Sequence, residues 1–240
     1  MAGKRRHRAA YAVLAAALLF ALAAGIYLGR YYHSDPAVSR FLESSGTVTV
    51  ERVPGGWRFD GPGKGSAVIF YPGGKVEAEA YAPLLFRLAE GGEDCFLAEM
   101  PVRLAIMKVG AAADIMAGYD YGEWILAGHS LGGAAAAMYA AREDSGVDGL
   151  VLLAAYPTKP LPDGLRLLSV YGSEDGVLDL SRYEEGKAYW PRDAAELVIE
   201  GGSHAQFGDY GVQKGDGAAL ISREEQQRVT ADAILRWLGR

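Results

Sequence analysis

The stretch Gly128-His129-Ser130-Leu131-Gly132 decides the expected fold. It follows the apolar run 124–127 and precedes an alanine-rich segment, 134–142, that has helical character. Glycines at both ends of such a pentapeptide remove the side chains that would collide in a sharp turn from strand to helix. A serine at the centre of this turn is held in a strained backbone conformation and exposed at the end of its strand. Ser130 is therefore predicted to be a nucleophile.

Short apolar runs continue along the chain on both sides of this turn. They have the length of strands buried on both faces of a parallel sheet and lie at 67–71, 95–99, 124–127, 150–155, 165–171 and 196–200. Two further runs, at 47–51 and 57–60, are separated by a Pro-Gly-Gly turn and predict an antiparallel opening to the sheet. Segments with helical character lie between the runs, at 78–90, about 104–118, 134–142 and 224–238. This alternation predicts an α/β fold with about eight mostly parallel strands and helices on both faces.

A nucleophilic serine needs a base, and the chain has four histidines. His7 and His33 precede the predicted strands, and His129 lies inside the turn, where its ring cannot face Ser130. His204 remains, on a glycine-bearing loop directly after the last predicted parallel strand. His204 is therefore predicted to be the base.

The base in turn needs a carboxylate that orients it, and Asp175 is expected to do so. It lies between the serine and the histidine in chain order, shortly after the predicted strand 165–171, which is where such an acid is expected. Glycines on both sides of Asp175 allow a tight turn that points its carboxylate back over the strand end. Glu174 and Asp179 lie nearby and stay as alternatives.

The loop Tyr71-Pro72-Gly73-Gly74-Lys75 is predicted to complete the site as part of an oxyanion hole. Such a hole takes one backbone N–H from the residue after the nucleophile, here Leu131, and one from the loop after the third strand. Proline and paired glycines let this loop turn its N–H groups inward, so Gly74 or Lys75 is the expected second donor. A plain turn is the alternative interpretation.

Taken together, four motifs resemble the α/β-hydrolase superfamily, over nearly all of residues 46–240. They are Tyr71-Pro72-Gly73-Gly74, Gly128-His129-Ser130-Leu131-Gly132-Gly133, Gly172-Ser173-Glu174-Asp175 and Ser203-His204. In particular the chain resembles small bacterial members of the dienelactone-hydrolase-like branch that carry an N-terminal anchor. The resemblance implies the α/β-hydrolase fold, Ser130, Asp175 and His204 as the catalytic triad, no cofactor and no metal.

Two features depart from that branch. The dienelactone hydrolases themselves use cysteine as nucleophile, whereas this chain has Ser130. The segment 206–222 after the histidine, with Asp209 and Asp216 among several glycines, is longer than a minimal member needs.

The N-terminus predicts a membrane anchor. Residues 9–29 contain no charged side chain, and a helix rising ~1.5 Å per residue over that length reaches across a hydrocarbon core of about 30 Å. The basic flank 1–8 predicts a cytoplasmic N-terminus, followed by a single transmembrane helix, a linker at 30–45 and an extracytoplasmic hydrolase domain at 46–240. A cleaved signal peptide is the alternative, because Ala21-Leu22-Ala23 offers a cleavage site, and the domain would then be secreted.

The charge balance limits the partners. Residues 1–30 hold five of the 24 basic side chains and none of the 30 acidic ones, so the rest of the chain is distinctly acidic. Nucleic-acid binding needs a basic surface that displaces counterions from phosphates, and no nucleic-acid partner is expected. No feature of the sequence indicates an oligomeric state.

These residues predict a serine hydrolase that forms an acyl-enzyme and passes the acyl group to water. Only residues 156–164 are available for a lid over the site, so the large mobile lid of a long-chain lipase is not expected. The expected substrate is therefore a small-molecule carboxylic ester with a small or single-chain acyl group. Acyltransferases, peptidases and cofactor-free haloperoxidases use the same groups and stay as alternatives, since the fold does not separate them. A non-catalytic surface binding module on the same scaffold is a further alternative.

Overall fold

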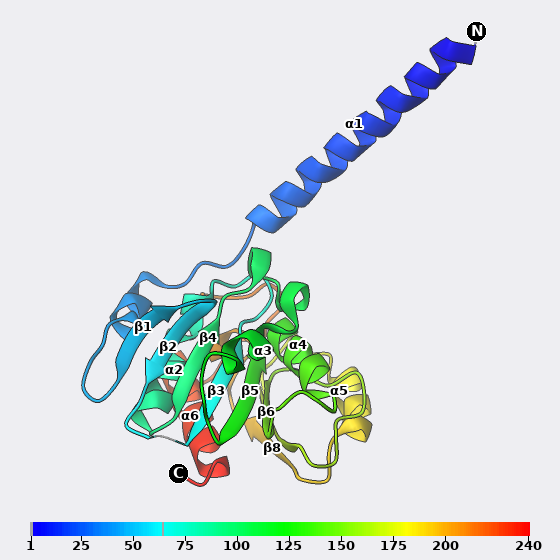
Figure 1. Cartoon of the computed structure of the whole chain (residues 1–240). Coiled ribbons are helices and arrows are strands. Elements are labelled where there is room, and N and C mark those ends of the chain that lie inside the picture. Colours follow the sequence, from blue (N-terminus) through cyan, green and yellow to red (C-terminus); the bar gives the residue numbers. More distant parts are fainter. Residues whose placement is uncertain (1, 64) are drawn as a thin grey trace. The chain divides into compact units, whose positions relative to one another are not determined.

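The computed structural model describes residues 2–63 and 65–240, with side chains for Tyr11 and from residue 13 onward except residue 64 (Figure 1). The chain divides into two compact units, residues 1–31 and 32–240, and each is described by itself.

The first unit is a single helix, α1 (Ala2–Gly29). Its large apolar side chains from residue 13 onward are exposed, among them Leu18, Leu19 and Phe20. Among the residues that the structure describes, no helix is both long and apolar enough to cross a membrane, so the predicted span over 9–29 is not supported. The predicted basic flank, 1–8, lies outside the described side chains.

The second unit is built on one eight-stranded sheet in the order β1-β2-β4-β3-β5-β6-β7-β8. The strands are β1 (Thr49–Val53), β2 (Gly56–Asp60), β3 (Ser66–Tyr71), β4 (Asp94–Ala98), β5 (Glu123–His129), β6 (Gly149–Leu153), β7 (Arg166–Gly172) and β8 (Ala194–Ile199). β2 runs antiparallel to β1 and β4, and all pairs from β4 to β8 are parallel. The prediction of about eight mostly parallel strands with an antiparallel opening is confirmed.

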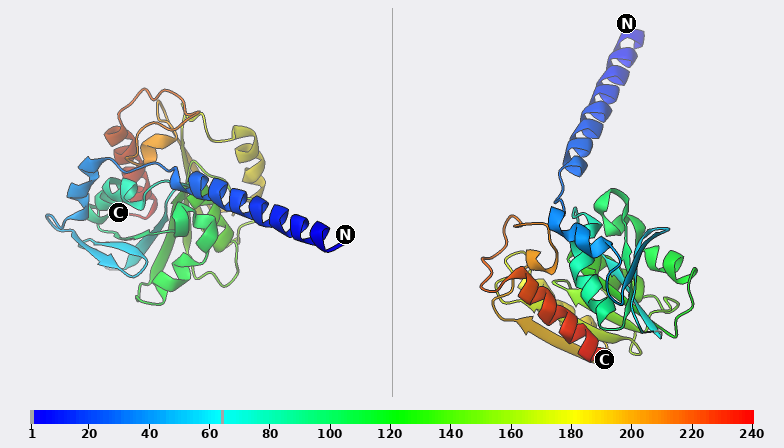
Figure 2. Two further views of the ribbon diagram at one scale, coloured as in Figure 1. Left: turned by 90° about the horizontal axis from the view of Figure 1, so that it is seen from above. Right: turned by 90° about the vertical axis from the view of Figure 1, so that its left-hand side faces the viewer.

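Helices cover both faces of this sheet. They are α2 (Ala82–Glu90), α3 (Ala111–Met116), α4 (Leu131–Ala140), α5 (Leu180–Gly186) and α6 (Arg223–Trp237). Short 3₁₀ segments lie in the connections: η1 (Pro36–Leu42), η2 (Ala78–Tyr81), η3 (Pro101–Arg103), η4 (Ala105–Lys108), η5 (Lys187–Tyr189) and η6 (Ala205–Phe207). The right-hand view of Figure 2 shows α2 and α6 side by side on one face.

The two faces of the sheet each carry a hydrophobic core. Val68 and Phe70 of β3 pack into the core with α2 and α6, whereas Ala67 and Ile69 pack into the core with α3 and α4. Successive side chains of a strand point to opposite faces, so a continuous apolar strand serves both cores at once.

Two predicted segments differ from the structure in their detail. The helix expected over about 104–118 is divided into η4 and α3, with Gly110 between them, and glycine is among the poorest helix formers. The short helix α5 was not predicted from sequence. Its N-cap is Asp179, whose side chain accepts a hydrogen bond from the Arg182 backbone N–H.

Residues 32–45, expected as a linker, belong to the compact second unit. The Tyr32 N–H donates to the Lys75 carbonyl oxygen at 2.7 Å, and the Tyr32 carbonyl accepts from the Glu77 N–H at 3.0 Å. The Ser34 N–H and hydroxyl both donate to the Glu77 carboxylate, and η1 places Phe41 against Phe86 of α2. Hydrogen bonds to the loop after β3 and a ring contact with α2 thus attach this segment to the second unit.

Candidate active site

The predicted site residues lie beyond the carboxyl ends of β3, β5, β7 and β8. The chain passes from β3 to β4 on one side and then returns to β5 on the other side of β3. The loop after β3 and the turn after β5 are therefore neighbours, and the register pairs Tyr71 with Gly128 at that edge. In open α/β sheets such a reversal point is where ligands bind.

The turn after β5 has the predicted strained geometry. Ser130 has φ 52° and ψ −122°, in the left-handed half of the backbone map that non-glycine residues rarely adopt. Its N–H donates to the Leu153 carbonyl at 2.9 Å, and its carbonyl accepts from the Ala134 N–H at 3.0 Å. These bonds to β6 and to the first turn of α4 hold the serine in this conformation.

The glycines of this turn allow a direct backbone contact with the loop after β3. A side chain at Gly132 would collide with the carbonyl oxygens of Tyr71 and Pro72. A side chain at Gly128 would lie 2.6 Å from the Gly132 carbonyl carbon. Both positions therefore need glycine, as the sequence indicates.

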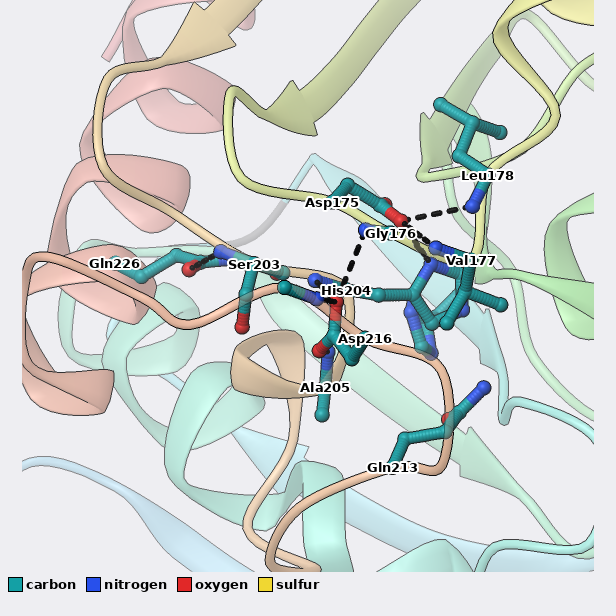
Figure 3. A network of polar contacts seen from close by, with 12 residues as sticks. Asp175, Gly176, Val177, Leu178, Ser203, His204, Ala205, Gln213, Asp216 and Gln226 are labelled. Atoms are coloured by element: carbon teal, nitrogen blue, oxygen red, sulfur yellow. Dashed lines mark hydrogen bonds and ion pairs between the residues drawn. The ribbon is translucent and has the colours of Figure 1, made fainter.

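Asp175 and His204 form a buried pair. His204 Nδ1 lies 2.9 Å from Asp175 Oδ2 and 3.1 Å from Oδ1, and both side chains are 1% exposed. Asp175 Oδ1 also accepts from the Val177 and Leu178 N–H groups at 2.9 and 2.8 Å (Figure 3). Because Nδ1 faces a carboxylate, it carries the imidazole proton and Nε2 is left with a lone pair. Nε2 has no hydrogen-bond partner among the described residues.

The alternative acids do not contact the histidine. The Glu174 side chain accepts from the Ser173 hydroxyl at 3.0 Å, on the surface. The Asp179 side chain caps α5 and lies 3.4 Å from the guanidinium of Arg182. Of the three carboxylates considered from sequence, Asp175 alone is bonded to His204 in the described part of the chain.

The two candidate second donors of the oxyanion hole differ in what their N–H groups do. The Lys75 N–H donates to the Arg103 carbonyl at 2.8 Å and is engaged there. Gly74 lies directly against Leu131, since a side chain at Gly74 would come within 2.8 Å of Leu131 Cδ2. The Lys75 N–H is thus already engaged, which leaves Gly74 as the candidate second donor.

Comparison with known families identifies the family of the chain. A model of the alpha/beta hydrolase family matches residues 67–228. The chain belongs to this family. No curated protein gave a significant match.

Solved structures similar to this hydrolase include enzymes described as esterases and serine hydrolases. An esterase from Mycobacterium tuberculosis is 15% identical with a TM-score of 0.60, and the match covers 85% of this chain and 97% of that one. A thermophilic esterase from Thermogutta terrifontis is 16% identical with a TM-score of 0.54, covering 76% and 88%. A serine hydrolase involved in carbazole degradation is 12% identical with a TM-score of 0.59, covering 80% and 99%. At these identities the likeness establishes the fold.

Sequence reasoning missed Tyr81, which joins the loop after β3 to the turn after β5. Its hydroxyl accepts from the Gly73 N–H at 3.1 Å and lies 2.8 Å from Nδ1 of His129. Burial lowers the pKa of His129 well below its usual value, and the charge of neighbouring His204 lowers it further. His129 is therefore a neutral partner of Tyr81, in agreement with its exclusion as the base. A tyrosine inside a predicted helical segment carries no sequence signal for this contact.

Ser130 and His204 line one cavity, with a volume of ≈ 320 Å³. Its other walls are mostly apolar and come from the segments that follow β5, β6 and β7: Leu131, Ala134, Ala154, Ala155, Tyr156, Thr158, Val177, Leu178 and Asp179. Two slightly larger cavities, of ≈ 380 and ≈ 370 Å³, are lined by neither Ser130 nor His204. Among the described side chains no cluster of three or more histidine, cysteine or acidic residues is placed to hold a metal ion.

The paired geometry predicts different effects for two adjacent carboxylates. Asp175→Asn should keep the fold but lower turnover by up to roughly 10⁴-fold, because an amide selects the wrong histidine tautomer and cannot stabilise an imidazolium. Glu174→Gln removes the same charge one residue away and should change turnover little. Steady-state kinetics on an activated ester would measure both. Equal losses in the two variants would show that the charge of the loop matters and that the bond to His204 does not.

Proposed function

We propose that this hydrolase is a serine esterase with Ser130 as nucleophile, His204 as general base and acid, and Asp175 as the orienting carboxylate. The observation that carries the proposal is the buried His204–Asp175 pair, whose unpartnered Nε2 belongs to a ring lining the same cavity as Ser130. A buried imidazole held at one nitrogen and free at the other is suited to move a proton at the free one.

The reaction follows from these positions. Ser130 Oγ attacks the ester carbonyl carbon while His204 Nε2 takes the hydroxyl proton. The negative charge on the carbonyl oxygen is stabilised by the N–H groups of Leu131 and Gly74. His204 then gives its proton to the departing alkoxide, which leaves an acyl-enzyme. Water, deprotonated by the same nitrogen, hydrolyses that intermediate and restores the serine.

The cavity supports a small or single-chain acyl group as the substrate class. Its volume, ≈ 320 Å³, is at the lower end of the range of ligand pockets, about 300 to 1,000 Å³. The connection between β6 and β7, where a lid was considered from sequence, is short and contains no helix. Alanines 134, 154 and 155 line the cavity, so the space beside the serine exists because these side chains are small.

The proposal extends to the location of the catalytic unit, which we place outside the cytoplasm. Its support is the sequence: a basic flank ahead of an uncharged run over 9–29 directs the downstream chain across the membrane, whether the segment is retained as an anchor or cleaved as a signal peptide.

The first test is covalent labelling. A fluorophosphonate should label Ser130, because a serine activated by His204 attacks phosphorus as it attacks a carbonyl. Ser130→Ala should abolish labelling and lower turnover on the order of 10³-fold or more. Ser39→Ala, on exposed η1, serves as the matched control and should behave as the parent. Peptide mapping that placed the label on another residue would sink the assignment.

The second test concerns acyl-chain length. Ala134→Leu adds a branched side chain to the cavity wall and should lower kcat/KM for longer acyl esters while sparing acetate esters. Each excluded methylene is worth about 1 to 3 kcal/mol, or about 10- to 200-fold. Met138→Leu, on the same helix but exposed and away from the cavity, is the control. A uniform loss across all chain lengths would show that the cavity does not hold the acyl group.

The third test concerns location. Protease added to intact cells or spheroplasts should degrade the catalytic unit while a cytoplasmic marker protein stays intact. Degradation of the unit only after lysis would place it in the cytoplasm and contradict the proposal.

A further inference from the structure

The segment after the histidine, which is longer than the fold requires, returns to the catalytic residues. Within residues 206–222, Asp216 lies beside His204 and the turn after Asp175 (Figure 3). The two triad-bearing loops thus meet at a carboxylate that belongs to neither loop.

Asp216 accepts hydrogen bonds from four backbone N–H groups. Oδ1 accepts from the N–H groups of His204 at 3.0 Å, Gly176 at 3.2 Å and Gly217 at 2.9 Å. Oδ2 accepts from the Ala205 N–H at 2.8 Å. One carboxylate therefore binds the backbone of the histidine, the backbone of the residue after the acid, and its own loop.

The Asp216 loop and the turn after Asp175 lie close enough for these hydrogen bonds only because two residues, one in each segment, lack side chains. A side chain at Gly176 would lie 2.5 Å from the Gly215 carbonyl oxygen, and a side chain at Gly217 would collide with the Glu174 carbonyl oxygen. Glycine on both sides of the contact lets the loop 215–217 lie directly on the turn 174–176.

The charge of Asp216 is met by these N–H groups. Among the described residues it makes no ion pair with a lysine, arginine or histidine side chain. Bonds from N–H groups to an ionised carboxylate are about twice as strong as neutral ones. Asp175 and Asp216 thus hold the same residue, His204, by its ring and by its backbone respectively.

We propose that Asp216 is a positioning residue for the catalytic histidine. It fixes the His204 backbone against the turn after Asp175, so that the bond between Nδ1 and the Asp175 carboxylate is kept through the reaction cycle. The proposal rests on the serine-esterase function proposed above. The expected loss of rate follows from the displacement of the reacting group, since a shift of about 1 Å can lower the rate about 10²-fold.

The experiment measures turnover per competent site in the full chain with Asp216→Asn. The amide has the size of the carboxylate but turns an NH₂ group toward N–H donors, so it cannot accept all four bonds. Active-site titration with a fluorophosphonate counts the folded sites. We expect kcat per titrated site to fall about 10- to 100-fold. KM should stay within about twofold, because Asp216 does not line the substrate cavity.

Asp209→Asn is the matched control. Asp209 lies on the same segment, carries the same charge and is bonded to Arg223 and Gln227 of α6, away from the triad. Its loss should lower the thermal unfolding midpoint without changing kcat per titrated site. Asp216→Glu, which keeps the charge on a longer stem, should recover part of the rate lost in Asp216→Asn.

Two outcomes overturn the inference. One is a parental kcat per titrated site in Asp216→Asn, which would make the carboxylate a stabilising group only. The other is failure of both Asp216 variants to fold, which would assign these hydrogen bonds to folding and not to the histidine. Ser130→Ala, measured in parallel, distinguishes these outcomes from failure of the proposed function. If Ser130→Ala kept its activity, the proposed triad itself would be wrong.

Discussion

The contact between two backbones at Gly132 is the constraint on which the site depends. The turn after β5 can lie against the carbonyls of Tyr71 and Pro72 only because no side chain separates them. This brings Leu131 beside Gly74, and it places Ser130 at the point where the strand order reverses. The strained conformation of the serine is maintained by bonds to β6 and α4, so the cores on both faces of the sheet supply the free energy that offsets it.

Local chemistry explains what the sequence could predict. Apolar runs, glycines and a strand-to-helix turn are short-range signals, and they located the sheet, Ser130 and the loop after β3. Elimination among four histidines located His204, and chain order located Asp175. The choice between Gly74 and Lys75 needed the Arg103 carbonyl, which lies on a separate loop.

Long-range polar contacts explain what the sequence could not predict. Tyr81 joins the loop after β3 to His129, and Asp216 joins the two loops that carry Asp175 and His204. Each partner is a common polar residue in an irregular or helical segment, with no periodicity that marks its target. The attachment of residues 32–45 to Lys75 and Glu77 was not predicted for the same reason. A polar segment resembles a linker until the groups that accept its hydrogen bonds are known.

The second unit begins at Tyr32, and the Tyr32 N–H donates to the Lys75 carbonyl in the loop after β3, so the unit begins beside the candidate active site. Removing residues 1–31 would replace the Tyr32 amide by a free ammonium beside the loop after β3. Cleavage at the site considered from sequence, after Ala23, would instead leave the peptide bond before Tyr32 untouched. The cleaved chain and the intact chain would then keep the same short bridge between Tyr32 and Val76. Residues 24–31 separate that position from Tyr32, where the second unit begins, so loss of residues 1–23 would leave the hydrogen bond between Tyr32 and Lys75 in place.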